Sequence, residues 1–220
     1  GSVLMVLVFV EAVARLVGIN EPPLVAPDEV RGWSLVSNRP GVTNRLGMRD
    51  RERTIAKSDG SVRIAILGDS MAEGIQVARA DTFPAVLEMQ LNQDETCFGG
   101  RPVEVLNFAV QGYGTAQQYL TLDRHVWPFD PDLVLLAAFP GNDIRDNSKA
   151  LKGNLYLPFY HLKDGALALD TSFRSHWSYH LRAIGARIIQ HSLLAQMINQ
   201  VRGLLKAQIR ANTDRQETLG

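Results

Sequence analysis

Three short and mainly hydrophobic runs lie in the middle of the chain, and a polar turn that contains glycine follows each run. The runs are Ile64–Leu67, Val103–Val110 and Leu133–Phe139. Short apolar runs are typical of strands buried in a parallel sheet. The turns are Gly68-Asp69-Ser70, Gln111-Gly112-Tyr113-Gly114 and Pro140-Gly141-Asn142-Asp143. We therefore expect polar groups along the carboxyl edge of a sheet, where open α/β sheets hold their sites.

Two segments between these runs have the spacing of helices. The first can be capped by Asp81 or Thr82, and its predicted buried face consists of Phe83, Val86, Leu87 and Leu91. The second covers about 115–126. The order strand, helix, strand, helix, strand predicts parallel strands joined by right-handed crossovers, and hence an α/β fold.

The amino-terminal stretch Val3–Val17 is almost wholly apolar, with Glu11 and Arg15 as its only charges. This pattern favours a membrane anchor or signal over an amphipathic helix packed on the domain. The stretch is shorter than the roughly 20 residues that span a bilayer, and no basic segment precedes it. We therefore expect the end of an anchor whose beginning is missing. Because no small-residue cleavage site follows, we expect a retained anchor and a domain that faces the periplasm or the outside of the cell.

The predicted organisation has three parts: an anchor helix over 1–20, a connector over 21–61 and an α/β domain over 62–220. Prolines punctuate the connector, Trp33 is expected to attach it to the domain by burial, and the polar run 44–50 is interpreted as a solvated loop. Lys163-Asp164-Gly165 predicts a hairpin turn. In the last long helical run, the expected buried stripe is Ile184, Ile188, Leu194, Met197, Val201 and Leu205.

Composition excludes some kinds of function. The chain has 23 Lys and Arg residues and 23 Asp and Glu residues, so it lacks the basic excess of a nucleic-acid-binding protein. Its single cysteine, Cys97, rules out an intramolecular disulfide, and the histidines do not have the spacing of zinc ligands. We expect neither a metal nor a cofactor.

Ser70 lies where a nucleophile would lie, directly after a buried strand. An ordinary turn is the alternative, because glycine, aspartate and serine all favour turns. The other two strand ends support the nucleophile, since acyl transfer also needs donors directed at the oxygen that becomes negative. The backbone N–H groups of Ser70 and Gly112 and the side-chain amide of Asn142 can supply them.

Gly68-Asp69-Ser70, Gly112 and Gly141-Asn142-Asp143, in this order, resemble the first three blocks of the SGNH (GDSL-type) hydrolases. The resemblance covers about 62–147, and the run 44–50 resembles a segment that membrane-anchored bacterial members carry before the domain. It implies a flavodoxin-like α/β/α fold and hydrolysis of esters, often acetyl or longer acyl groups on carbohydrates, lipids or small molecules. By matching position, Ser70 is the nucleophile, Gly112 and Asn142 complete the oxyanion hole, and Asp69 and Asp143 fix the turns beside the substrate.

The sequence departs from this family in one block. The family's Asp-x-x-His, which supplies the general base and its orienting carboxylate, does not occur here. The five histidines, none in the expected setting, are His125, His161, His176, His180 and His191. His125 is interpreted as a surface residue. Because a flavodoxin-like sheet has about five strands and we find three, we expect a fragment that lacks the last strands and the catalytic histidine, and that has little activity alone.

Two other interpretations stay open. A non-catalytic carbohydrate-binding or polymer-assembly protein on the same fold is the main alternative, followed by a purely structural domain. An α/β-hydrolase elbow of the form Gly-x-Ser-x-Gly fits poorly, because its last glycine is replaced by Ala72. The aromatic residues Tyr156, Phe159 and Tyr160 can stack on a sugar or simply pack within the predicted hairpin.

Overall fold

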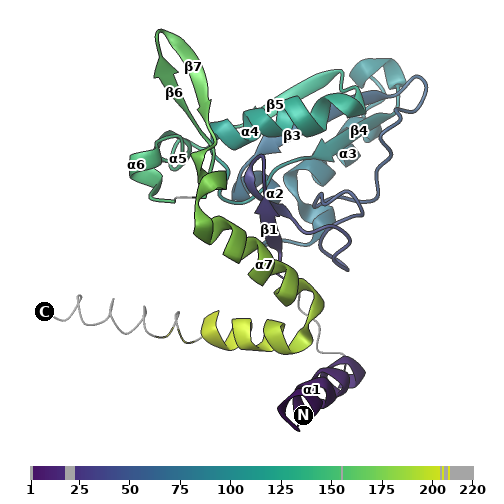
Figure 1. The fold of residues 1–220 in the computed structure, drawn as a ribbon. Coiled ribbons are helices and arrows are strands. Elements are labelled where there is room, and N and C mark those ends of the chain that lie inside the picture. Colours follow the sequence, from purple (N-terminus) through teal and green to yellow (C-terminus); the bar gives the residue numbers. More distant parts are fainter. Residues whose placement is uncertain (1, 18–22, 155, 204, 206–207, 209–220) are drawn as a thin grey trace, which may run out of the picture. The chain divides into compact units, whose positions relative to one another are not determined.

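The computed structural model describes residues 2–17, 23–154, 156–203, 205 and 208. The chain divides into two compact units, one formed by Val25–Tyr179 and the other by Gly1–Leu24 with His180–Gly220. The larger unit contains all strands of the described part of the chain (Figure 1). It is mixed α/β, as the hydrophobic pattern predicts.

The centre of the larger unit is a parallel sheet of three strands in the order β4-β3-β5. The strands are β3 (Val62–Gly68), β4 (Val103–Asn107) and β5 (Leu133–Ala137). Every residue of β3 is buried, as expected for a strand with neighbours on both sides and helices on both faces. Strand β4 ends earlier than predicted because the Asn107 side chain accepts a hydrogen bond from the Ala109 N–H at 3.1 Å, which turns the chain.

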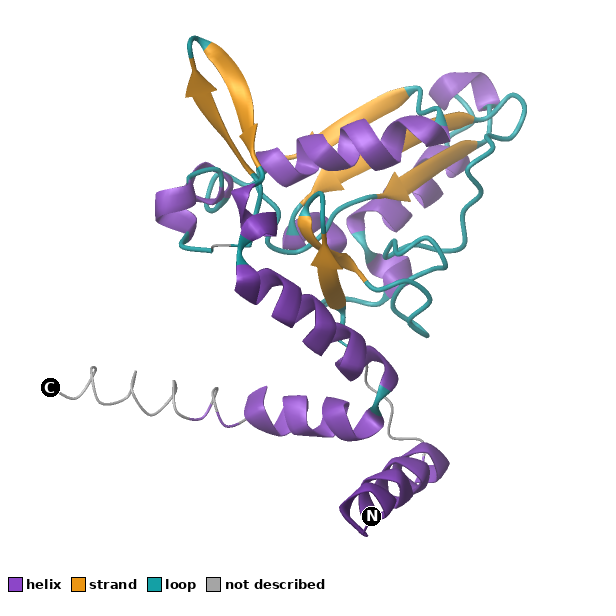
Figure 2. Cartoon of the chain, viewed as in Figure 1, coloured by secondary structure: helices purple, strands orange, loops and turns teal. Residues whose placement is uncertain are grey.

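Alternate residues of β3 contribute to two hydrophobic cores, one on each face of the sheet. Ala65 and Leu67 pack with Leu106, Phe108, Val126 and Phe129 on one face. Ile64 and Ile66 pack with Val105 and Ala72 on the other, where Leu87 and Leu91 cover them. The covering helices are α4 (Thr115–Thr121), which continues into a π-helical turn over Leu122–Val126, and α3 (Phe83–Gln93) (Figure 2).

The predicted buried face of α3 is correct except at its first residue. Val86, Leu87 and Leu91 are half-buried, but Phe83 is 50% exposed. Thr82 occupies the N-cap position, so Phe83 is the first helical residue, and the adjacent Pro84 is buried in its place. The helical spacing alone does not distinguish these two neighbouring positions.

The segment before the sheet forms part of the larger unit. It contains an antiparallel hairpin of β1 (Val25–Asp28) and β2 (Gly32–Leu35). Trp33 is only half-buried, but its indole N–H donates to the Gln111 carbonyl at 3.1 Å. The backbone carbonyl of Trp33 accepts a hydrogen bond from the Tyr113 hydroxyl at 2.6 Å. These bonds attach the hairpin to the turn after β4.

The interpretation of residues 44–50 as a solvated loop is wrong. Asn44, Met48, Arg49 and Asp50 are all buried. The Asn44 side chain closes the turn by accepting from the N–H groups of Leu46 and Met48, each at 3.0 Å. Met48 joins the hydrophobic core, so this polar run places an apolar residue in the interior of the larger unit.

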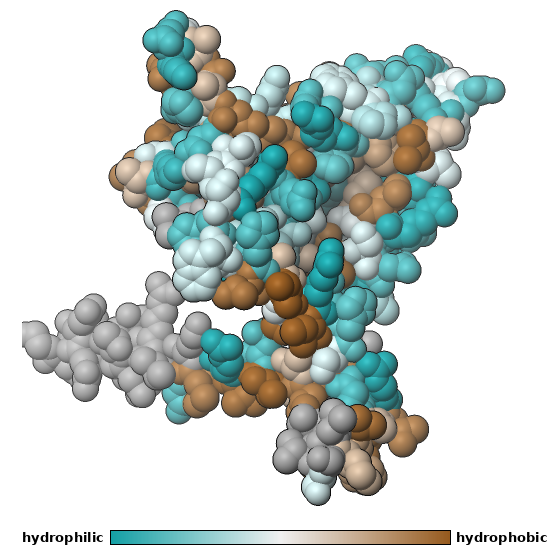
Figure 3. Space-filling model, viewed as in Figure 1, coloured by the Kyte–Doolittle hydropathy of each residue, from teal (hydrophilic) through white to brown (hydrophobic). Residues whose placement is uncertain are grey.

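Three one-turn helices and a hairpin complete the larger unit. The helices are α2 (Ser70–Glu73), α5 (Asp143–Asp146) and α6 (Lys149–Lys152). The hairpin consists of β6 (Phe159–Lys163) and β7 (Ala166–Asp170). Its turn is at Asp164 and Gly165, which both have positive φ, so the predicted hairpin turn is confirmed. Figure 3 shows apolar surface among polar atoms along this hairpin, where Leu162 and Leu167 are exposed.

The smaller unit contains α1 (Ser2–Val17), most of α7 (Trp177–His191) and a helical segment over 193–203. The Glu11 carboxylate accepts hydrogen bonds from the N–H groups of Leu193 and Leu194 and from the Ser192 hydroxyl, each at 3.0 Å. The Leu194 and Leu193 N–H groups lower the pKa of Glu11 to about 2. A charge from α1 thus satisfies the free N–H groups at the start of the last helical segment.

The predicted buried stripe of the last helical run is wrong in most positions. Ile184, Ile188, Val201 and Leu205 are exposed, and Leu194 and Met197 are half-buried, whereas Leu193 and Gln196 are buried. Before Ser192, where the helix is interrupted, the less exposed positions are Ala183, Gly185, Ala186, Ile189 and Gln190, which lie on the face opposite to Ile184 and Ile188.

In α1, Met5, Val6, Val8, Phe9, Val13 and Leu16 are exposed, whereas Val10 is half-buried. Among the described residues, none of the helices has the length and apolar character needed to cross a membrane.

Arg63, on the central strand, is expected to contribute strongly to stability. It is 1% exposed, pairs with Glu104 at 2.6 Å, and donates to the carbonyls of Ile55 and Phe129 at 2.8 and 2.7 Å. Removing one partner of a buried pair leaves the other charge uncompensated. We expect Arg63→Met to lower the free energy of unfolding by about 3 kcal/mol, measured by chemical denaturation.

The control is Arg45→Met, because Arg45 pairs with Glu52 where both side chains are more than half exposed. We expect this change to cost less than about 1 kcal/mol. Equal losses in the two variants would contradict the role assigned to Arg63.

Candidate active site

Ser70 is the first residue of α2, and the strand β3 ends two residues before it. The Asp69 side chain caps the helix by accepting from the Met71 N–H at 2.9 Å, and Ser70 is half-buried. The turn requires Gly68, since a Cβ there would lie 2.8 Å from the Cβ of Ala72 and 3.2 Å from that of Ala137. The Ser70 hydroxyl has no hydrogen-bond partner within the described chain.

Asn142 lies next to this turn. Its side-chain Nδ2 donates to Asp69 Oδ2 at 2.8 Å, which joins the end of β5 to the end of β3. Its Oδ1 is buried and has no partner in the part that the structure describes. One of the two amide hydrogens is used by Asp69, so a second remains for another acceptor.

Gly112 follows β4 in a turn with φ of +73°. A Cβ at this position would lie 3.1 Å from Cζ2 of the Trp33 ring. The Gly112 carbonyl accepts from the Lys152 ammonium at 3.1 Å, and Lys152 also binds Asp146. Lys152 therefore links the turn after β4 to the segment after β5.

The three predicted residues thus follow the carboxyl ends of adjacent parallel strands, with Ser70 on the central one. Asp69 and Asn142 are in direct contact. Asp143, the other predicted neighbour, accepts from the Phe139 N–H at 2.7 Å and so closes the turn after β5. Burial, together with the nearby Asp69 and Asp146 carboxylates, raises the pKa of Asp143.

Sequence reasoning missed Glu73, the last residue of α2. It is fully buried, its Oε2 accepts from the Gln111 N–H, and its Oε1 has no partner among the described residues. Burial raises its pKa, and the Gln111 N–H and the Arg49 charge reduce this effect. The only available signal was its position one helical turn after Ser70, because its partner is 38 residues away in the chain.

Among the histidines of the larger unit, none has a hydrogen bond to Asp69, Ser70 or Asn142 in the part of the chain that the structure describes. The Nδ1 of His176 is 2.6 Å from the Ser178 hydroxyl, and His161 is on the exposed part of β6. His125, interpreted as a surface residue, is half-buried and lines a cavity, so that interpretation is wrong. Within the described ranges, no group of three or more His, Cys, Asp or Glu residues is arranged to hold a metal ion.

Comparison of the chain with protein-family models and with curated proteins found no match. Assignment of a function therefore depends on the geometry of the strand ends.

The contact between Gly112 and Trp33 can be tested against Gly60, which has the same φ of +73° but no described atom within 4 Å of the position that a Cβ would take. We expect Gly60→Ala to lower the free energy of unfolding by about 1 kcal/mol, the cost of a side chain in the left-handed region. We expect Gly112→Ala to lower it by about 1 kcal/mol more, because the methyl group also presses on the Trp33 ring. Equal losses on denaturant unfolding would show that the ring contact is unimportant.

The raised pKa of Glu73 makes stability depend on pH. The folded state holds this proton more tightly than the unfolded state, so the contribution is fully present below the ordinary pKa of 4.5 and is lost as pH rises through the folded value. The free energy of unfolding should fall by up to about 1.4 kcal/mol per pH unit in that window relative to Glu73→Gln. The measurement is urea denaturation of both proteins across this range.

Glu52→Gln is the control, because Glu52 is an exposed carboxylate. The free energy of unfolding of Glu52→Gln should change with pH in the same way as that of the unchanged protein. A constant difference between the unchanged protein and Glu73→Gln would contradict the raised pKa.

Proposed function

We propose that the chain carries the nucleophile and oxyanion hole of a serine ester hydrolase with a flavodoxin-like SGNH fold. The observation that carries the proposal is the hydrogen bond from Asn142 to Asp69. It places the amide from the end of one strand beside the serine turn at the end of its neighbour. The proposed substrates are acetyl or longer acyl esters of carbohydrates or small molecules.

In this mechanism, the Ser70 hydroxyl oxygen attacks the acyl carbon, and the carbonyl oxygen becomes negative. The N–H groups of Ser70 and Gly112 and the free amide hydrogen of Asn142 stabilise that oxygen. The bond from the acyl carbon to the alcohol oxygen then breaks, the alcohol leaves with a proton, and water hydrolyses the acyl-serine to release the acid and restore the hydroxyl. The Asp69 carboxylate binds both the Met71 N–H and the Asn142 amide. Asp69 therefore orients the serine turn and the amide relative to one another before the substrate binds.

Ser70 also needs a base to accept its proton. We assign this role to the histidine of the Asp-x-x-His block, which these 220 residues do not contain. We further propose that α1 belongs to a membrane anchor and that the hydrolase faces the periplasm or the outside of the cell. The exposed apolar side chains of α1 support this second proposal.

The test compares the complete gene product with its Ser70→Ala variant on a chromogenic acetyl ester. We expect Ser70→Ala to lower kcat by at least about 10³-fold, because the remaining groups bind the substrate but cannot form the acyl intermediate. Asn142→Ala should lower kcat by about 10²-fold. We expect little activity from the 220-residue chain alone, because it lacks the proposed base.

Ser175→Ala is the matched control, since Ser175 is exposed and belongs to a 3₁₀ turn outside the proposed site. It should retain full activity. A complete gene product that binds a carbohydrate without hydrolysing its esters would favour the non-catalytic alternative. Activity that survives Ser70→Ala would remove the proposed nucleophile.

A further inference from the structure

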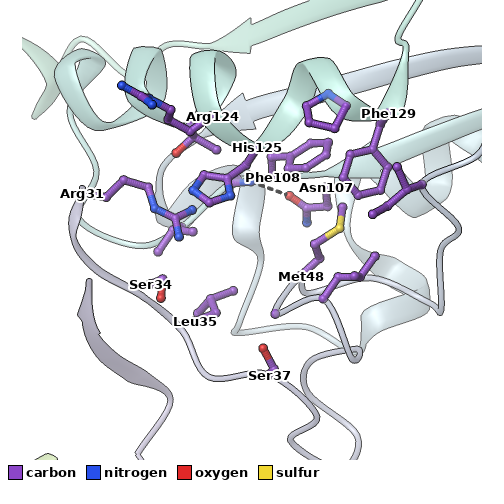
Figure 4. Close-up of a pocket in the computed structure, with 17 residues that line it drawn as sticks. Arg31, Ser34, Leu35, Ser37, Met48, Asn107, Phe108, Arg124, His125 and Phe129 are labelled. Carbon is purple, nitrogen blue, oxygen red and sulfur yellow. Dashed lines mark hydrogen bonds between the residues drawn. The ribbon is translucent and has the colours of Figure 1, made fainter. Parts of the chain in front are cut away.

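A cavity of about 320 Å³ lies beside the carboxyl end of β4, and none of the proposed catalytic residues lines it. Its walls come from the β1–β2 segment, the buried run before the sheet, the residues after β4 and the π-helical turn after α4 (Figure 4). The volume is at the lower end of the range for small-molecule sites, which starts at roughly 300 Å³.

One end of the cavity is polar and is lined by basic side chains. Arg31 and His125 point toward one another there (Figure 4). The Arg31 Nη2 pairs with Asp28 at 2.8 Å, but its Nε is buried and has no partner among the described residues. None of the described residues that line the cavity is acidic.

The rest of the cavity is mainly apolar. Leu35, Met48, Phe108 and Phe129 line it, and the two phenylalanine rings pack edge to face with their centroids 5.3 Å apart. These residues also belong to or adjoin the hydrophobic core, so this wall is fixed by packing. A ligand that fits both ends needs a polar head and a short apolar body.

The π-helical turn over Leu122–Val126 places His125 on the cavity wall. Such turns are rare and occur frequently at functional sites, because they insert one residue and change the direction of a side chain. Val126, the next residue, is fully buried in the core. The turn therefore keeps the core packing while it directs the imidazole into the cavity.

We propose that this cavity binds a small monocarboxylate with a short apolar chain or ring. The carboxylate accepts hydrogen bonds from the free donors of Arg31 and from His125, and the apolar body lies against Phe108 and Phe129. This site does not depend on the esterase proposal.

A single negative charge fits better than a phosphate dianion. Asp28 already compensates most of the Arg31 charge. Arg124, the other arginine at the cavity, is largely exposed and pairs with Asp123 at 2.9 Å. The site therefore provides the ligand carboxylate with one charge-assisted hydrogen bond from Arg31 and one hydrogen bond from His125.

The charged groups that act on His125 are Arg31 and Asp28 from the hairpin segment and Arg124 from its own turn. Burial and the positive charge of Arg31 lower the pKa of His125 below its ordinary value of 6.5. A bound carboxylate favours the imidazolium, so binding should raise the pKa of His125. This shift is a readout that a merely structural histidine would not give.

The experiment is an NMR titration of the chain with hexanoate, with hexylamine and hexanol as probes of the same chain length. We expect hexanoate to bind with a dissociation constant of about 1 mM or tighter, a realistic affinity for so small a ligand. Shifts should be largest at Arg31, Phe108 and His125, and the His125 resonance should titrate at higher pH in the complex.

Arg31→Gln should weaken hexanoate binding about tenfold, and His125→Phe about threefold, with little effect on hexanol. Arg31→Lys keeps the charge beside Asp28, and therefore tests the donor geometry if Arg31→Gln does not fold. Arg187→Gln is the matched control, because this arginine is exposed and lies in the smaller unit.

Three results would overturn the proposal. One is no binding of hexanoate at about 10 mM. Another is equal affinity for hexanoate, hexanol and hexylamine. The third is wild-type affinity both in His125→Phe and in Arg31→Gln, or in Arg31→Lys if Arg31→Gln does not fold.

Discussion

The buried ion pair between Asp50 and Arg53 is the contact on which the placement of the segment before the sheet, residues 25–61, depends. Both side chains are almost inaccessible to solvent, and they are joined by two hydrogen bonds of 2.9 Å. Arg53 also donates to the Val105 carbonyl of β4 and pairs with Glu88 of α3. Because a buried charge without its partner is strongly unfavourable, this segment is held against the sheet and α3 together.

The same network reaches the proposed active site. The Asp50 carboxylate accepts from the Asn107 N–H at 3.1 Å, and the Asn107 amide donates to the Ala72 carbonyl in α2 at 3.2 Å. Arg49 donates to the carbonyl of Gly74, directly after that helix. The turn that carries Ser70 is thus supported by residues that precede the whole sheet. The position of Ser70 therefore depends on these polar contacts as well as on the strand that precedes it.

The sequence predicted the features that depend on local pattern. The three strands, their parallel order and the polar residues at their ends follow from short apolar runs and the turns after them. The burial of Asn44, Met48, Arg49 and Asp50 was not predictable from local pattern, because polar residues are usually exposed. Asp50 and Arg53 are buried here because they find partners more than 50 residues away. For the same reason Glu73 was missed, since only the distant Gln111 N–H makes its burial tolerable. The predicted stripe of the last helical run is wrong because the less exposed positions before Ser192 include small and polar residues, such as Ala183, Ala186 and Gln190, which a search for large apolar residues does not select.

The position of β3 in the centre of the sheet has a consequence for synthesis on the ribosome. Val62–Gly68 is made first among the three strands, yet both of its neighbours are made later, and the second of them ends at Ala137. Throughout the translation of the next two, the emerging chain therefore exposes the strand whose residues all become buried. Domains fold as units once their parts are available, so chaperones that bind nascent apolar segments should recognise Val62–Gly68 during that interval.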